Sequence, residues 1–500
     1  MTSTHTSDQR TSDQRTPARR PLPFPAGSVV ISAQAPAGSP LEDAEVMAAL
    51  AHAAELGGAA AIRANGAAHV AAIAAVVGVP VLGINKQGNR AGVYITPTFE
   101  SAAEVVAAGA SAVALDGTAR PRPDGVPLSE LVARIHDELG VAVMADCDSV
   151  ESAQFAAAAG CDAVATTLAG YVDGSAGPGP DLELLREMAT AVSVPVVGEG
   201  RFSTPEHVAM AFALGAHAVV VGQAVTNPIE TTRALVSAAA AGVDRPHPWV
   251  NQRTAAAVIS TAVARVTATQ SEAIGHAAAI VLAAIEAGGI VQAFGTGHSR
   301  GFAMEVAGRA GGLVPANQLA VKDLVLYGGA EPDSILTPEA ERDPAIATRI
   351  LELAALHPAD CFMIASNSGG NGATVEMAIE AKRRGHPVIA VTSLEHSSRI
   401  ASRHPSGKRL FEVADLVIDN GSPFGDAALP LPEPGLGAIV PVSAVTSAFI
   451  AQMIAAEVSG ALLAHGQRPP VLISANIPGG DEHNEQVRAR YGDRIKVGEP

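Results

Sequence analysis

The sequence has little cysteine, no clustered basic residues and no apolar leader, and each shortage excludes a class of protein. Its 500 residues hold three cysteines, Cys147, Cys161 and Cys361, without paired spacing. We therefore expect structural thiols in a reducing compartment, with neither a disulfide framework nor a metal site. Lys and Arg total 33 against 50 Asp and Glu, which gives a net charge of −17. Because the basic residues are also scattered, the sequence shows no basic patch that would bind nucleic acid.

The amino terminus is polar, with the duplicated segment TSDQRTSDQR followed by prolines, and it lacks the apolar core of a secretory signal. We predict a disordered tail over residues 1–26 and a cytoplasmic protein. Residues 436–456 form an uncharged stretch long enough to cross a bilayer. Its Ser, Thr, Gln and Pro content favours a buried helix, so no membrane partner is expected.

Short apolar runs alternate with Ala-rich helical segments along residues 29–224. Each of the eight runs is rich in Val and Ala and is followed by a loop and a helix, which is typical of buried parallel strands. This order predicts a (β/α)₈ TIM barrel, whose active site is built at the carboxyl ends of the strands. The residues at those ends are Gln34, Arg63, Lys86, Asp116, Asp146, Thr167, Glu199 and Gly222.

The chain is too long for one hydrophobic core, so a second domain is expected. We place the barrel at residues 27–241, a Pro-containing linker at 242–254 and a second domain at 255–500. In the second domain, apolar strands end in Gly- and Ser-rich loops that open helices. This pattern predicts a doubly wound α/β fold.

Lys86 and Glu199 are the candidate acid–base pair of the barrel. Lys86 ends an uncharged run, and burial there would lower its pKa and let it act as a base. Glu199 stands in the sequence GEG, where a carboxylate shielded from water can exchange protons near neutral pH. The pair suggests proton transfer at carbon, and the alternative is an ion pair between Lys86 and Glu199 that merely closes the barrel.

The loops after the seventh and eighth strands are the usual place for a phosphate in this fold. They contain Gly200 and Arg201, and Gly222 and Gln223. We therefore predict a small phosphorylated substrate.

The motifs SAQ, AIRAN, GINK, YITPT, ALDGT, MAD, TTLAGY, GEGR and VVGQAVTNP follow one another over residues 27–240. In this order they resemble the bacterial N-acetylmannosamine-6-phosphate 2-epimerase family. The resemblance implies inversion at carbon 2 to give N-acetylglucosamine 6-phosphate, without a cofactor. It implies Lys86 as the principal base and Glu199 as proton donor or ring-opening group, and one or two bases remain possible.

The resemblance also implies that Gln34, Arg63, Asp146 and the Gly200 and Gly222 loops hold the sugar phosphate. Asp116 and Thr167 are expected either to contact the ligand or to support the scaffold. Two residues depart from the family pattern. Ala33 stands where Cys is frequent, and Asn227 stands where an Arg that helps to hold phosphate is frequent. We hypothesise that Arg201 supplies the missing charge; the alternative is a barrel that acts on another sugar phosphate.

In the second half, the loops GTGHS and SNSGGNG offer hydroxyls and backbone N–H groups at helix starts, which suits a phosphate. Together with RAGG, SRH, GDA and GGDEHN, they resemble an uncharacterised bacterial family of sugar isomerase (SIS) domains over residues 255–495. The resemblance implies phosphate contacts from Ser299, Ser366 and Ser368, and simple helix capping is the alternative for the last two.

Glu305 lies in FAMEVAGR, a segment similar to the helix that carries a catalytic glutamate in phosphoheptose isomerases. That likeness implies a base for aldose–ketose interconversion, and an ordinary helix-surface charge is the alternative. The late-helix histidine of those isomerases is missing from residues 442–463, while His298, Glu482 and His483 lie on loops that could reach a ligand, also from a neighbouring subunit. We expect a homo-oligomer that binds phosphorylated amino sugars. Its second domain is either an isomerase or a non-catalytic sensor that regulates the barrel.

Overall fold

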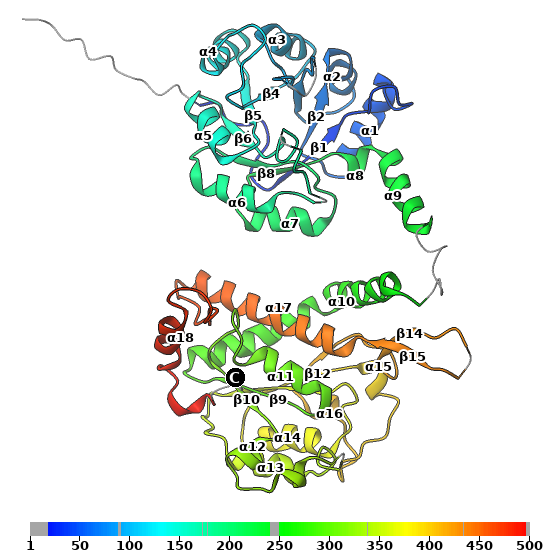
Figure 1. Cartoon of the computed structure of the whole chain (residues 1–500), viewed down its shortest axis with the longest axis vertical. Helices are drawn as coiled ribbons and strands as arrows, with labels where there is room; N and C mark the ends of the chain where they lie inside the picture. The colour runs from blue at the N-terminus through cyan, green and yellow to red at the C-terminus, as the bar shows by residue number, and fades with distance from the viewer. Residues whose placement is uncertain are drawn as a thin grey trace, which may run out of the picture. The chain divides into compact units, whose positions relative to one another are not determined.

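The computed structural model describes residues 19–496 except 89–91, 173, 178, 241–249, 338 and 434. The chain forms two compact units that divide between residues 241 and 242 (Figure 1). Each unit has its own sheet and its own hydrophobic core.

The first unit is a closed barrel of eight parallel strands in sequential order, with helices outside it (Figure 1). This confirms the predicted TIM barrel. The strands are β1 Ser28–Ala33, β2 Ala61–Asn65, β3 Val81–Ile84, β4 Ala112–Asp116, β5 Ala142–Asp146, β6 Ala163–Ala165, β7 Val196–Gly198 and β8 Ala218–Val221. The helices are α1 Ala44–Leu56, α2 Ala67–Ala74, α3 Phe99–Ala107, α4 Leu128–Arg134, α5 Val150–Ala158, α6 Leu182–Ala191, α7 Pro205–Ala213, α8 Gln223–Thr226 and α9 Pro228–Ala240, and a π-helical turn covers Ile135–Leu139.

Alternation along each strand sorts the side chains into two cores. On β2, for example, Ala61 packs inside the barrel, whereas Ile62 and Ala64 pack against the helices. Because side chains alternate with a period of two, Arg63 points inward at the carboxyl end of the same strand. The candidate residues at the other strand ends also occupy inward-facing positions, so they lie together at the barrel mouth.

Part of the segment that the sequence predicts as a disordered tail packs on the barrel. Phe24 is buried among the interior side chains, and Leu22 packs beside them. The Arg20 backbone N–H donates to Asp162 Oδ1 at 2.6 Å, and the Arg20 guanidinium donates to the carbonyl of Gly140 at 3.0 Å. The prediction is therefore wrong for residues 19–26, because an aromatic side chain fills the barrel interior. Residues 1–18 lie outside the described part of the chain.

The second unit is built on five parallel strands in the order β10-β9-β11-β12-β13. Their bounds are β9 Val291–Gly295, β10 Ala316–Leu319, β11 Cys361–Ala365, β12 Val388–Thr392 and β13 Leu416–Asp419, and a separate antiparallel hairpin joins β14 Ala427–Pro430 to β15 Ala438–Pro441. The strand order reverses direction between β9 and β11, which is the doubly wound arrangement expected from the sequence.

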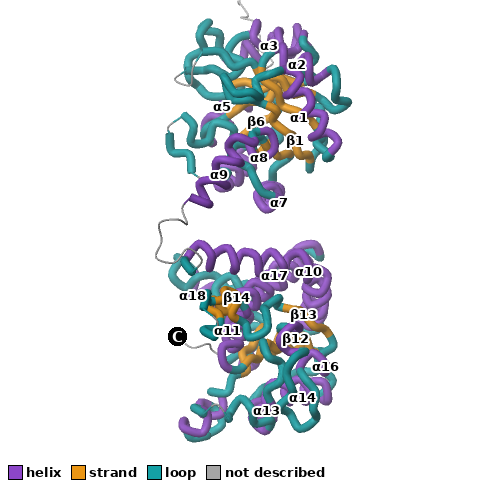
Figure 2. Tube along the Cα trace, turned by 90° about the vertical axis from the view of Figure 1, so that its right-hand side faces the viewer, coloured by secondary structure: helices purple, strands orange, loops and turns teal. Residues whose placement is uncertain are grey.

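Helices cover both faces of this sheet (Figure 2). One core lies under α10 Gln252–Glu286, α11 Arg300–Val306 and α17 Ser443–Ala464. The other lies under α13 Ala345–Glu352, α14 Gly372–Arg383 and α16 Leu410–Val413. The remaining helices are α12 Asp323–Leu326, α15 Leu394–Ser397 and α18 Gly480–Arg488, with 3₁₀ turns at Gly297–Ser299, Pro332–Ile335 and Gly492–Arg494.

The structure of the predicted linker (242–254) and of the apolar stretch (436–456) differs in part from what the sequence predicts. Helix α10 begins at Gln252, with Asn251 as its N-cap, so the end of the predicted linker is helical, while residues 242–249 lie outside the described residues. The stretch 436–456 enters the hairpin before it forms the first half of α17. Helices α10 and α17 are both long and apolar enough to cross a membrane by length and composition. In this unit they pack side by side against the sheet.

Candidate functional site

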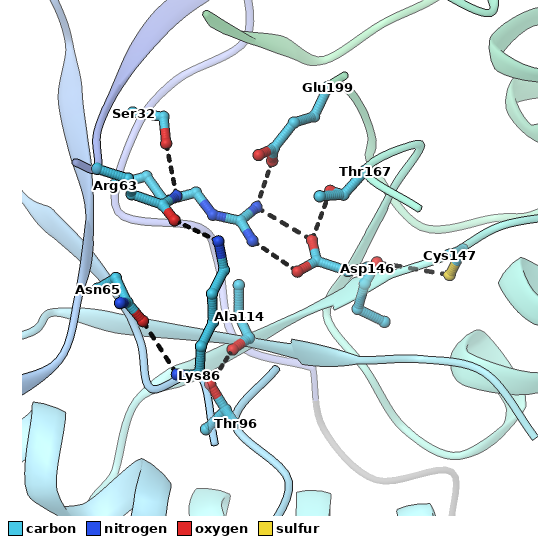
Figure 3. A network of polar contacts seen from close by, with 12 residues as sticks. Ser32, Arg63, Asn65, Lys86, Thr96, Ala114, Asp146, Cys147, Thr167 and Glu199 are labelled. Atoms are coloured by element: carbon cyan, nitrogen blue, oxygen red, sulfur yellow. Dashed lines mark hydrogen bonds and ion pairs between the residues drawn. The ribbon is translucent and has the colours of Figure 1, made fainter. Parts of the chain in front are cut away.

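A buried arginine at the barrel mouth holds two carboxylates from different strands (Figure 3). Arg63 on β2 donates from Nη1 and Nη2 to both oxygens of Asp146 on β5, at 3.0 and 2.6 Å. Arg63 Nη1 also pairs with Glu199, which follows β7. The side chains of Arg63 and Asp146 are 1% and 0% exposed, so this bidentate pair lies in a dry environment where charge-assisted hydrogen bonds are strong.

Glu199 is the group at this mouth that is best suited to exchange protons near neutral pH. Burial raises the pKa of Glu199 to about 7, although Arg63 lowers it. The hydroxyl of Thr166 accepts from the Glu199 backbone N–H at 3.0 Å and donates to its carbonyl at 2.8 Å, so the main chain at Glu199 is fixed. A carboxyl group with this pKa can both donate and accept a proton at pH 7.

Lys86 reaches the same mouth from the end of β3 (Figure 3). Its ammonium donates to Gln34 Oε1 at 2.6 Å, and Gln34 Nε2 in turn donates to the hydroxyl of Ser32 at 2.7 Å. The Asn65 side chain accepts from the Lys86 backbone N–H at 2.9 Å. Lys86 is exposed, so the expectation that it is buried among apolar walls is wrong. The direct ion-pair partner of Glu199 is Arg63 rather than Lys86, although the charge of Lys86 also lowers the pKa of Glu199.

Asp116 and Thr167 have different surroundings. The Asp116 carboxylate accepts from the backbone N–H and the hydroxyl of Thr118, at 3.0 and 2.6 Å, and from Arg120 at 2.7 Å. Asp116 therefore anchors the loop that follows β4. Thr167 donates to Asp146 Oδ1 at 2.6 Å and so belongs to the cluster around Arg63.

The two predicted phosphate loops lie at the carboxyl ends of β7 and β8. Gly200 has φ of +96°, and Gly222 precedes the short helix α8, which begins at Gln223. Arg201 also adopts a positive φ, 61°, a conformation that is uncommon for residues with a side chain. Its guanidinium donates to the carbonyls of Gly179 and Ala169 at 2.6 and 2.8 Å. These hydrogen bonds join the loop after β7 to the loop after β6.

The two departures from the family pattern fall in different places. Ala33 packs in the core between the strands and the helices, so it lies outside the mouth. Asn227 is buried at the end of α8, and its side-chain oxygen accepts from the Glu230 backbone N–H at 3.3 Å at the start of α9.

Neither the acidic residues nor the cysteines form a metal site within the residues that the structure describes. All three cysteines are buried and free. Burial raises the pKa of Cys161 and of Cys361 to about 12, and that of Cys147 well above its usual value. These thiols stay protonated and unreactive at neutral pH.

In the second unit, the two glycine-rich loops meet at the point where the strand order reverses. The loop Gly295–Ser299 follows β9, and the loop Ser366–Gly372 follows β11, its neighbour in the sheet. Ligands of doubly wound folds bind at this carboxyl edge. Ser366 is buried and its hydroxyl accepts from the Gly369 backbone N–H at 3.1 Å, whereas Ser368 and Ser299 are half-buried on the same edge.

Glu305 lies elsewhere. It is ion-paired with Arg309, which lies three residues beyond the end of α11, and its Oε1 accepts from Gln452 of α17 at 2.6 Å. It lines a cavity of about 20 Å³ together with Val291 and Ala316, which are the first residues of β9 and β10. Within the described residues, the polar contacts of Glu305 are therefore with Arg309 and Gln452.

The other candidates of this unit are spread over its surface. His298 is exposed in the first glycine loop. Glu482 and His483 lie on helix α18, so the expectation that they lie on loops is wrong. Glu482 is exposed there, and His483 donates to the Val471 carbonyl at 2.9 Å, which holds α18 against the preceding segment. The structure does not bring these three residues together with Glu305.

Comparison with known proteins assigns each half separately. Residues 47–241 match the family described as "Putative N-acetylmannosamine-6-phosphate epimerase". A protein of Cutibacterium acnes named "Putative N-acetylmannosamine-6-phosphate 2-epimerase" is 49% identical over 210 residues, which are 41% of this chain and 91% of that protein. The relative of the same name from Thermosynechococcus vestitus is 48% identical, over 44% of this chain and 96% of its own length.

The N-terminal half of the chain belongs to this epimerase family. Residues 256–393 match the SIS domain family. A "UPF0309 protein" of Geobacillus thermodenitrificans is 42% identical over 221 residues, 44% of this chain and 87% of that protein. Both resemblances seen in the sequence are thereby confirmed.

In the epimerase half, sequence reasoning missed two supporting residues. Asn65 orients the main chain at Lys86, and it stands two residues after Arg63, so strand alternation alone could have placed it at the mouth. Thr166 fixes the main chain of Glu199 but lies off that alternation. Only the folded barrel reveals it.

Proposed function

We propose that the barrel interconverts N-acetylmannosamine 6-phosphate and N-acetylglucosamine 6-phosphate. The observation that carries this proposal is the set of Lys86, Glu199, Arg63 and Asp146 at one barrel mouth in a member of the epimerase family. Both the fold and the family name point to a sugar phosphate, and an acid–base set at the mouth suits a reaction at a C–H bond.

The chemistry starts from the open-chain sugar. Its carbon 2 hydrogen lies beside the aldehyde, so removal of that proton gives an anion that the carbonyl oxygen stabilises. Lys86 is the proposed base, and Glu199 donates or shuttles protons, because its pKa of about 7 lets it exchange them at neutral pH. Return of the proton to the opposite face inverts carbon 2. Whether one base or two act is decided by experiment.

Arg63 is the proposed positioning residue of this set. It holds the carboxylates of Asp146 and Glu199 in one place, and its positive charge limits how far burial raises the pKa of Glu199. The phosphate is assigned to the backbone N–H groups of the Gly200 and Gly222 loops, with Arg201 supplying charge beside them.

The test is proton NMR of the full chain with N-acetylmannosamine 6-phosphate in deuterated water. We expect the gluco epimer to form with deuterium at carbon 2. Lys86→Ala should slow both processes by about a hundred- to ten-thousand-fold, the usual contribution of a positioned acid–base group. Lys382→Ala removes an exposed lysine of the second unit and is the matched control. Unchanged exchange in Lys86→Ala would remove this residue from the proposed role.

We also propose that the second unit binds a sugar phosphate at the loops that follow β9 and β11. This proposal rests on the two loops meeting at the topological switch point of the sheet. Ser366→Ala and Ser368→Ala should each weaken binding of glucose 6-phosphate, measured by calorimetry, by about tenfold. Affinities equal to that of the unsubstituted chain would leave these serines as helix caps.

A further inference from the structure

A chain of hydrogen bonds leads from Lys86 through Gln34 to Ser32 on β1 (Figure 3). The Lys86 ammonium donates to Gln34 Oε1 at 2.6 Å, and Gln34 Nε2 donates to Ser32 Oγ at 2.7 Å. Ser32 is 7% exposed. It has the same inward orientation as Val30, two residues earlier on the strand, which packs in the barrel interior. The proposed base of the barrel is therefore linked to a buried hydroxyl.

The donors and acceptors of this chain fit one orientation of the Gln34 amide. An ammonium group has three donors and no acceptor, so the amide oxygen must face Lys86. The amide nitrogen then faces Ser32, whose hydroxyl accepts from it. The amide of Gln34 is thus anchored at both ends, by Lys86 at its oxygen and by Ser32 at its nitrogen.

The elements around Ser32 fix the position of this anchor. Ser32 pairs in register with Arg63 of β2, the residue that holds the two carboxylates. On the other side of β1, Ile31 pairs with Val221 of β8. The hydroxyl of Thr226, in α8, donates to the Ser32 carbonyl at 2.8 Å. Because its main chain is bound from both sides of the strand, Ser32 is a rigid support for Gln34.

The orientation of Gln34 matters for the chemistry proposed for Lys86. A lysine acts as a base through the lone pair of its neutral amine. An amine that donates an N–H to Gln34 Oε1 keeps this lone pair for another group. If the amide turned round, Gln34 Nε2 would donate to the lone pair, and the amine could not take a proton from the substrate. The hydrogen bond to Ser32 opposes this turn, because the turn breaks it.

We propose that Ser32 is a positioning residue of the epimerase reaction. By accepting from the amide of Gln34, it keeps the amide oxygen toward Lys86 and so directs the amine of Lys86 at carbon 2 of the sugar. Ser32 acts through Gln34 and makes no contact with the substrate in this role. The inference rests on the proposed function of the barrel.

The first test is the kinetics of Ser32→Ala in the full chain with N-acetylmannosamine 6-phosphate. We expect kcat to fall by about ten- to a hundredfold, the usual effect of a misplaced catalytic group, while KM changes by less than about twofold. Exchange of the carbon 2 hydrogen with deuterated water should slow by the same factor as kcat.

Ser28→Ala is the matched control. Ser28 begins the same strand, is 5% exposed, and donates to the Pro25 carbonyl at 2.6 Å at the amino end of the barrel. Its replacement also removes a buried hydroxyl from β1, so it should lower Tm about as much as Ser32→Ala does. Its kcat should stay within about twofold of the unsubstituted chain, because Ser28 lies at the end of β1 away from Gln34.

A second measurement follows the Gln34 amide directly and does not depend on epimerase activity. Glutamine is labelled selectively with ¹⁵N, and the side-chain amide signal of Gln34 is identified by its absence in Gln34→Ala. We expect the amide hydrogens of Gln34 to exchange with water at least about tenfold faster in Ser32→Ala than in the unsubstituted chain, because they lose their acceptor. In Ser28→Ala the rate should be unaltered.

The outcomes separate the alternatives. A kcat of Ser32→Ala within about twofold of the unsubstituted chain overturns the proposal, and a fall in Tm without a change in kcat would make Ser32 purely structural. A rise in KM with kcat retained also overturns it, since Ser32 would then bind the substrate itself. If the unsubstituted chain does not epimerise the sugar, the proposed function of the barrel fails. The amide measurement still decides whether Ser32 holds Gln34, and equal exchange rates in all variants refute that role.

Discussion

Replacing Arg63 by Met would leave two carboxylates in the barrel mouth without their cation. The guanidinium is 1% exposed, and it pairs with Asp146, which is 0% exposed, and with Glu199. Removing one partner of a buried ion pair typically costs about 3–5 kcal/mol, because an uncompensated charge stays buried. For a unit of this size, that loss corresponds to a fall in Tm of roughly 6–20 °C.

The penalty should depend on pH, and its sign follows from Glu199. Burial already raises the pKa of Glu199 to about 7, and Arg63 opposes that rise, so loss of Arg63 moves the pKa higher still. A raised pKa stabilises the folded protein fully below the ordinary value of 4.5, and this contribution disappears as pH rises through the folded value. Arg63→Met should therefore lose more stability at pH 8 than at pH 5.5.

The assay is differential scanning calorimetry of the full chain at both pH values, with attention to the transition of the first unit. The triple variant Arg63→Met, Asp146→Asn, Glu199→Gln removes the carboxylate charges together with the cation. It should recover most of the lost Tm, because no unpaired charge remains buried. A Tm of Arg63→Met within 2 °C of the unsubstituted chain at pH 8, or an equal loss at both pH values, would refute the reasoning.

Three further substitutions test other parts of the structure. Phe24→Ala should lower the free energy of unfolding of the barrel by about 3–5 kcal/mol, because it leaves a cavity inside the strands. The measurement is urea denaturation, and an unchanged midpoint would contradict the packing of the amino-terminal segment. Gly372→Ala should destabilise the second unit by about 1–3 kcal/mol, because the new Cβ would clash with the carbonyl of Arg342. Gly275→Ala is the control, since a Cβ there meets open space on α10. Equal Tm values for the two variants would argue against the close contact between Gly372 and Arg342. Arg201→Ala should raise the KM for N-acetylmannosamine 6-phosphate about tenfold if this guanidinium replaces the cation missing at Asn227, and an unaltered KM would assign it to the loop alone.

The repeat of apolar runs was enough to predict the barrel and its mouth. Burial of parallel strands on both faces requires continuous apolar runs, and alternation then fixes which residues point inward. Gln34, Arg63, Lys86, Asp146, Thr167 and Glu199 could therefore be assembled from the sequence. The two glycine loops of the second unit could also be predicted from the sequence. A loop that joins a strand to a helix in this fold is rich in Gly and Ser, and that composition is visible in a few consecutive residues.

Only the tertiary structure decided which of these groups pair and which lie apart. The sequence placed Lys86 and Glu199 on one rim, but the fold pairs Glu199 with Arg63 and leaves Lys86 exposed beside Gln34. Phe24 shows the same limit, because a polar, Pro-rich segment does not reveal that one aromatic ring finds space inside a barrel. The hydrogen bond from the Arg20 backbone N–H to Asp162 is a further example, because it joins segments far apart along the chain. Such contacts are set by packing rather than by neighbours in the sequence.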